Sequence, residues 1–171
     1  MSKPRMSSKR SRKSEVDALF FRADKEWNRG KLRSAFRLFL LAAKGGDKAS
    51  QVNVGNFYSD GTGIRRNIPK ALYWYRRAYR RGDASAANNI GIVWRDAGNQ
   101  QRALSWFLRA VKLGNDGSNL EIAKYYLRNA NDPTSAISYL EKVCQSDHAS
   151  EGEVEKAKRA LKQANRKLTH G

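Results

Sequence analysis

The sequence has a single cysteine, Cys144, and only three prolines among its 171 residues. One cysteine excludes an intrachain disulfide framework, so we expect a reducing compartment and predict a cytoplasmic location. The longest nearly uncharged apolar run, residues 38–43, is far shorter than the roughly 18 residues that a membrane-spanning helix needs. The sequence therefore predicts a soluble protein without a membrane span.

Groups that support catalysis or metal binding are also scarce. One of the two histidines, His148, stands four residues after Cys144, which offers two zinc ligands where a structural site needs four. The segment Gly61-Thr62-Gly63 lacks the third glycine of a dinucleotide-binding fingerprint and the lysine of a phosphate-binding loop. We predict that the protein is not an enzyme and that it holds no metal and no cofactor.

Positive charge is abundant, because 34 Lys and Arg residues stand against 16 Asp and Glu residues and give a net charge of +18. An excess of this size indicates an acidic partner. Three segments carry it and contain no acidic residue: residues 1–14, 61–82 and 156–171. Because the first of these has almost no apolar side chains, we predict that residues 1–14 form a disordered basic tail.

A pattern of apolar and aromatic residues repeats along the chain. Residues 70–78 recur 32 positions later, an earlier copy lies 36 positions upstream, and a weaker copy surrounds residues 136–143. Apolar residues in each copy fall at i, i+3, i+4 and i+7, which is the stripe of an amphipathic helix. Another helical segment precedes each copy, at residues 16–27, 49–58, 84–97 and 120–128.

Helix-start signals accompany this pattern. We predict N-caps at Asp47, at Asp83 and at Asp132 before Pro133, and capping boxes that pair Ser118 with Glu121 and Ser150 with Glu153. The sequence thus predicts an all-α repeat domain over residues 15–148, made of about four helix-turn-helix units. A last helix within residues 149–171 carries an apolar stripe that covers the end of the stack.

One stretch has a more specific pattern. Residues 49–82 contain Val54-Gly55, the loop Gly61-Thr62-Gly63-Ile64 and the pair Trp74-Tyr75. This stretch resembles a Sel1-like repeat (SLR), a relative of the tetratricopeptide repeat (TPR), while residues 84–114 resemble a plain TPR. The resemblance implies a right-handed α-solenoid that works as a non-catalytic adaptor or scaffold with a concave groove for a protein partner. In both stretches a glycine, Gly55 or Gly91, lies on the apolar face where it lets two helices approach closely.

By analogy with TPR geometry, the first helix of each unit lines the groove. The groove residues that this analogy predicts are Asn56, Ser59, Asn88, Ile92, Arg95, Lys124 and Arg128. They are polar to basic, so they favour an acidic peptide or protein as the partner. The alternative is a solvated helix face that binds nothing.

A second set of residues points to another class of partner. Arginines with an interleaved tyrosine between residues 61 and 82 are typical of a surface that binds phosphates and stacks on bases. This basic patch consists of Arg65, Arg66, Tyr73, Arg76, Arg77, Arg80 and Arg81. The sequence therefore keeps nucleic-acid binding by a helical repeat protein as an alternative function.

Overall fold

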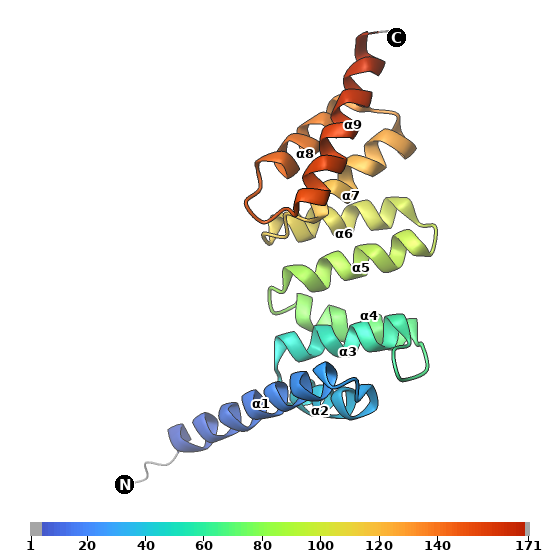
Figure 1. Cartoon of the computed structure of the whole chain (residues 1–171). Helices are drawn as coiled ribbons and strands as arrows, with labels where there is room; N and C mark the ends of the chain where they lie inside the picture. The colour runs from blue at the N-terminus through green and yellow to red at the C-terminus, as the bar shows by residue number, and fades with distance from the viewer. Residues whose placement is uncertain (1–4, 170–171) are drawn as a thin grey trace. The chain divides into compact units, whose positions relative to one another are not determined.

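The computed structural model describes the backbone of residues 5–169, and the secondary structure in that range is entirely helical (Figure 1). This confirms the all-α prediction. The chain divides into two compact units, and the boundary in the sequence lies between Asp83 and Ala84.

The first unit holds four helices in two antiparallel pairs. They are α1 (Arg5–Asn28), α2 (Leu32–Gly45), α3 (Lys48–Asp60) and α4 (Ile68–Tyr79). Each helix packs on the next along the chain, and the core between them includes Phe39, Val54 and Phe57. The side chain of Asp47 accepts a hydrogen bond from the backbone N–H of Ser50 and caps α3, as predicted.

Helix α1 is longer than the first predicted helix. It begins at Arg5, so its backbone includes residues 5–14 of the predicted tail, and the disorder of that segment in solution stays a prediction. Residues 1–4 of the tail lie outside the described residues.

The close approach predicted at Gly55 is present between α3 and α4. A Cβ atom at this position would collide with the ring of Tyr75 on α4. Ala71, Trp74 and Ala78 of α4 also face inward and are buried, as the apolar stripe predicts. The two helices therefore approach closely where Gly55 of α3 faces the ring of Tyr75 of α4.

The second unit continues the helical pattern. It contains α5 (Ala84–Asp96), α6 (Gln100–Lys112), α7 (Ser118–Tyr125), the π-helix η1 (Tyr126–Ala130), α8 (Pro133–Gln145) and α9 (Glu151–Thr169). Gly91 on α5 faces the ring of Phe107 on α6, which repeats the contact of the first unit. Helix α9 packs on α8 with Ala157 buried, which is the place predicted for the last helix.

Two of the predicted caps in this unit are confirmed and one is wrong. Asp132 accepts from the backbone N–H of Ser135, and Ser150 and Glu153 hydrogen-bond each other reciprocally. Ser118, in contrast, is the first residue of α7 and not its cap, because the side chain of Asn115 accepts from the Ser118 backbone N–H. The predicted capping box of Ser118 and Glu121 therefore does not form.

The helix predicted over residues 120–128 also ends differently. The helix changes to π-helical winding at Tyr126. The carbonyl oxygen of Tyr126 accepts hydrogen bonds from the backbone N–H groups of Asn131 and Asp132. Asn131 adopts a left-handed conformation with a φ of 49°, which stops the helix. Hydrophobic periodicity does not distinguish such a turn from an α-helical one.

Candidate functional site

A pocket of about 220 Å³ opens in the second unit between α5, α6, α7 and η1. Its floor comes from α6, where Ala103 and Phe107 are almost fully buried and Leu104 is half-buried. Its walls are polar and charged. The lining residues with polar side chains are Arg95, Gln100, Glu121, Lys124, Tyr125, Arg128 and Asn129.

The local sequence fixes the floor in place. Asn99 accepts a hydrogen bond from the backbone N–H of Arg102 and so starts α6. From that start, helical spacing brings Ala103 and Phe107 to the same face, and Phe107 packs against Gly91 of α5 and the buried Ile122 of α7. The apolar floor is therefore part of the core that joins α5, α6 and α7.

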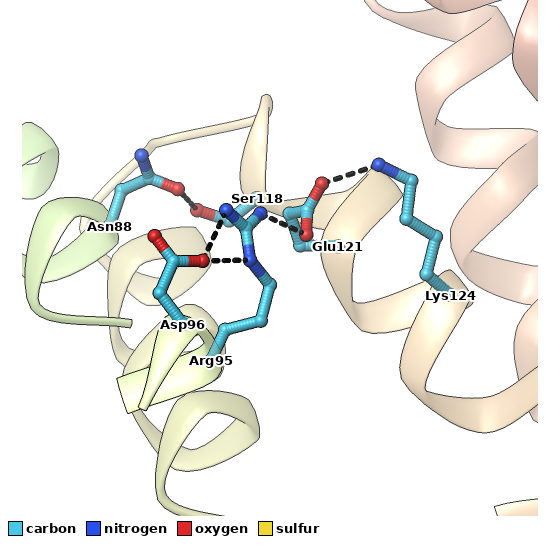
Figure 2. A network of polar contacts seen from close by, with 6 residues as sticks. All are labelled: Asn88, Arg95, Asp96, Ser118, Glu121 and Lys124. Carbon is cyan, nitrogen blue, oxygen red and sulfur yellow. Dashed lines mark hydrogen bonds and ion pairs between the residues drawn. The ribbon is translucent and has the colours of Figure 1, made fainter. Parts of the chain in front are cut away.

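An ion-pair network forms one wall of the pocket (Figure 2). The Arg95 guanidinium donates to Glu121 across 2.8 Å and also contacts Asp96 across 2.9 Å. The Lys124 ammonium lies 2.5 Å from the other oxygen of the Glu121 carboxylate. One carboxylate thus lies between two cations that come from different helices.

The network shifts the pKa values of its members. Burial by itself raises the pKa of Glu121, but hydrogen bonds from Lys124 and Arg95, together with their charges, outweigh burial and hold it below its ordinary value. Burial likewise opposes the charged form of Arg95, yet hydrogen bonds to Glu121 and Asp96 raise its pKa. Both shifts favour the charged forms of Glu121 and Arg95.

The π-helix supplies another part of the pocket lining. Arg128 and Asn129 of η1 line the pocket and are exposed. Within residues 5–169, no carboxylate forms an ion pair with Arg128. The lining residues carry three cations and one carboxylate, so the pocket keeps a net positive charge.

The structure brings three of the seven predicted groove residues together in this pocket: Arg95, Lys124 and Arg128. Two others in the same unit lie elsewhere. The Asn88 side-chain oxygen lies 2.9 Å from the Ser118 hydroxyl, which donates to it, and Figure 2 shows this contact beside the ion pairs. Ile92 packs against the core formed by Ala103, Phe107 and Ile122. These two side chains contact neighbouring helices and do not line the pocket.

The remaining two predicted groove residues belong to the first unit. Asn56 accepts a hydrogen bond from the Tyr75 hydroxyl at 2.8 Å and lines a different pocket, between α1, α2 and α3. The backbone oxygen of Ser59 accepts from Arg66 at 2.8 Å.

The predicted basic patch is spread along α4. Arg65 and Arg66 precede this helix of 12 residues, Arg80 and Arg81 follow it, and such a helix rises by about 18 Å. Three of the patch arginines have partners within the unit: Arg66 contacts Ser59, Arg81 donates to the carbonyl of Gly46, and Arg77 donates to the Tyr73 hydroxyl at 3.3 Å. Tyr73, Arg76 and Arg80 remain exposed around the C-terminal half of α4.

Sequence reasoning missed four polar residues of the pocket: Gln100, Glu121, Tyr125 and Asn129. The spacing of three between Glu121 and Lys124 is a signal for an ion pair on a helix and was available in the sequence. The contact between Arg95 and Glu121 bridges 26 positions, and no local pattern indicates it.

Together, the repeated helix pairs and the pocket on an apolar helix floor define an all-α helical-repeat protein. Within the described range, no group of three His, Cys, Asp or Glu side chains is arranged to hold a metal ion. In residues 5–169 there is also no helix long and apolar enough to cross a membrane.

Comparison with known proteins gives the family. The chain belongs to the Sel1-like and TPR-like repeat proteins: residues 28–47 and 48–83 match the Sel1 repeat, and residues 84–115 match a tetratricopeptide repeat. A sel1-like repeat-containing protein of Acanthamoeba polyphaga mimivirus is 30% identical over 86 residues, which is 50% of this chain. The chain spans only 16% of the length of that relative.

Solved structures agree with this assignment. A Sel1 repeat protein from Oxalobacter formigenes is 30% identical with a TM-score of 0.54, and the match covers 63% of this chain and 46% of the other. A protective antigen of uropathogenic Escherichia coli with an SLR fold gives a TM-score of 0.70 at 19% identity, covering 94% of this chain and 40% of the antigen. The second likeness bears on the fold alone.

Proposed function

We propose that this protein is an adaptor that binds an acidic segment of a partner protein in the pocket of its second unit. Repeats of the Sel1 and TPR type generally mediate protein–protein interaction. The observation that carries the proposal is the excess of cations over an apolar floor, with Arg95, Lys124 and Arg128 around Phe107. This arrangement matches an acidic side chain next to an apolar residue, or the C-terminal carboxylate of a chain that ends in an apolar residue.

The three cations differ in how available they are to a ligand. Arg95 is held by Glu121 and Asp96, so it positions the wall more than it binds. Lys124 shares Glu121 with Arg95, and its side chain is 41% exposed. Arg128 is exposed and forms no ion pair with a described carboxylate. A ligand carboxylate is therefore expected to pair first with Arg128 and then with Lys124.

The test uses fluorescein-labelled peptides that carry glutamates beside a leucine, titrated with the full chain and followed by fluorescence anisotropy. The double variant K124Q/R128Q removes the two available cations from the pocket. We expect it to bind the peptide about tenfold more weakly, because exposed ion pairs contribute about 0.2–1 kcal/mol each and a tenfold loss of affinity corresponds to about 1.4 kcal/mol.

The matched control is K158Q/K162Q, which removes two exposed cations from α9 and leaves the pocket intact. It is expected to bind like the unaltered chain at physiological salt. Equal weakening by both double variants would mean that the net charge attracts the peptide, and the pocket would not be the binding site.

A second candidate function, nucleic-acid binding, is favoured by one observation. Arg76 and Arg80 are exposed next to Tyr73, which is 56% exposed, and no described carboxylate forms an ion pair with either arginine. Phosphates would pair with the arginines while a base stacks on the tyrosine.

Anisotropy of labelled single-stranded and double-stranded oligonucleotides tests this candidate. If Arg76 and Arg80 bind phosphates, the R76Q/R80Q variant lowers affinity and reduces the slope of log affinity against log salt by about two. Loss of binding by the unaltered chain at physiological salt would remove this candidate.

The proposal assigns no chemical reaction and no cofactor to the protein, because the pocket of the second unit fits recognition of a charged segment. It also places the adaptor in the cytoplasm, where the single thiol of Cys144 would stay reduced.

A further inference from the structure

A smaller pocket of about 140 Å³ lies in the first unit, between α1, α2 and α3. Its lining differs in chemistry from that of the second unit. Two carboxylates, Asp24 and Asp60, and two amides, Asn53 and Asn56, surround the aromatic rings of Trp27, Phe39 and Phe57, with Thr62 at the edge.

An aromatic wall is fixed in this pocket. The ring of Trp27 meets the ring of Phe57 edge-on, with centroids 5.2 Å apart and planes at 89°. Phe57 is 2% exposed and holds the indole from the core side, whereas Trp27 is 44% exposed. The indole ring is therefore positioned by the core and still accessible from the pocket.

The charge of this pocket opposes that of the chain. No lysine or arginine lines it, although the sequence has more than twice as many basic as acidic residues. Asp24 accepts one hydrogen bond, from Asn28 at 3.2 Å, and neither Asp24 nor Asp60 forms an ion pair with a described cation. Two carboxylates thus retain acceptor capacity beside an exposed indole ring.

We infer that this pocket takes the cationic side chain, arginine or lysine, of a basic segment in a partner protein. The carboxylates would accept its N–H groups, and the Trp27 ring would attract the cation through its π-face. The amide of Asn53 is suited to the backbone of the same segment, because an amide offers both a donor and an acceptor.

The size of the pocket supports a single side chain as the occupant. Its volume of about 140 Å³ is well below the roughly 300–1,000 Å³ of pockets that enclose small-molecule ligands. Nonspecific attraction does not explain such binding either, since a net charge of +18 repels a basic segment. Binding of a cationic peptide by this chain therefore requires a local site.

The experiment compares three labelled Gly/Ser peptides: one with arginines, one with citrullines, which keep the shape of arginine without its charge, and one with glutamates. Each is titrated with the full chain and with D24N/D60N, which neutralises the pocket and retains its shape. We expect the arginine peptide to bind, and its affinity to fall about tenfold in D24N/D60N and by a similar factor with citrulline.

The matched control is E141Q/D147N, which removes two exposed carboxylates from the second unit. It changes the net charge by the same amount as D24N/D60N, and it is expected to leave binding of the arginine peptide unaltered. Three results would overturn the inference. D24N/D60N could bind the arginine peptide as tightly as the unaltered chain does, or the citrulline peptide could bind as tightly as the arginine peptide. The control variant could also weaken binding as much as D24N/D60N does. Thermal unfolding of each variant separates a folding defect from a binding defect.

Sedimentation of the chain alone tests whether the occupant is instead a basic segment of a second copy of this chain. If the unaltered chain self-associates and D24N/D60N does not, the pocket holds a basic segment of a second copy, and the assignment to a partner protein is wrong. This inference does not depend on the acidic-segment proposal, because its residues lie in the first unit and its probe has the opposite charge. The K124Q/R128Q variant is expected to bind the arginine peptide normally.

Discussion

The guanidinium of Arg95 on α5 and the carboxylate of Glu121 on α7 lie 2.8 Å apart, and this ion pair ties two helices that are 26 positions apart in the sequence. Glu121 is the inner partner, with a side chain only 17% exposed, and Lys124 contacts its other oxygen. The same contact that joins the helices therefore also sets the charge of the pocket wall.

Replacing Glu121 with glutamine is expected to lower the free energy of unfolding by about 1 kcal/mol, because it removes the partner that Arg95 and Lys124 share, and partly exposed ion pairs contribute about 0.2–1 kcal/mol each. Urea denaturation followed by circular dichroism measures the change. Glu141→Gln is the control, since Glu141 is exposed, and it should stay within about 0.5 kcal/mol of the unaltered chain. Equal losses in both variants would show that the Glu121 contacts contribute nothing.

The contribution of Glu121 is also expected to depend on pH. Its pKa is lower in the folded chain than in the unfolded chain, so the unfolded state binds the proton more readily. The stabilisation is therefore complete above the unfolded pKa of about 4.3 and is lost as pH falls through the folded value. The difference in urea midpoint between the unaltered chain and Glu121→Gln should shrink from neutral pH to about pH 3. A constant difference would contradict the depressed pKa.

Two glycines in helices should respond in opposite directions to the same substitution. Gly91→Ala places a methyl group against the ring of Phe107, and overpacking of this kind costs about 1–3 kcal/mol. At Gly152 in α9 a Cβ meets no atom within 4 Å, so Gly152→Ala should stabilise by up to about 1 kcal/mol through helix propensity. Thermal unfolding of the two variants and of the unaltered chain measures both changes in stability. Stabilisation by Gly91→Ala would mean that α5 and α6 are not in close contact there.

Ser118→Ala is expected to lower stability without changing peptide binding. The Ser118 hydroxyl lies 2.9 Å from the side-chain oxygens of both Asn88 and Asn115, and the residue is fully buried. Its removal takes this donor from the side-chain oxygen of Asn88, whereas Asn115 keeps the backbone N–H of residue 118, and a part-buried acceptor left without its donor costs about 1–3 kcal/mol. Urea denaturation and the acidic-peptide titration are run on the same variant, with the exposed Ser105→Ala as the control. A loss of peptide affinity in a fully folded variant would mean that Asn88 belongs to the binding site after all.

The helices and their inward faces were predictable because their signals are local. The stripe that includes Ala71 and Trp74 repeats every three to four residues, and the glycines at 55 and 91 stand opposite aromatic positions at a fixed repeat spacing. Asp132 and the pair of Ser150 and Glu153 act within four residues of a helix start. Such features depend on neighbours along the chain, which a sequence shows directly.

The candidate sites were predictable only in part because they depend on contacts between distant residues. Arg95, Lys124 and Arg128 were placed on the groove side by repeat geometry, but Glu121, the shared partner of Arg95 and Lys124, was assigned to a cap that Asn115 provides. Of the residues that line the acidic pocket of the first unit, only Asn56 was predicted from the sequence as a binding residue. Asp24 and Asp60 lie 36 positions apart, and neither forms a motif with the residues around it.

The π-helical turn at Tyr126–Ala130 bears on how this chain tolerates changes in length. A bond between residues five apart encloses one residue more than the bond of an α-helix, so the turn accommodates an additional residue while the segments on both sides keep their places. A single deletion within it would let the segment wind as an ordinary helix. Arg128 and Asn129 would then turn by about 100° relative to the residues before the deletion, and the pocket would lose a wall without any loss of helix. A change in length by one residue at this point would thus alter the lining of the pocket and leave the rest of the repeat unit helical.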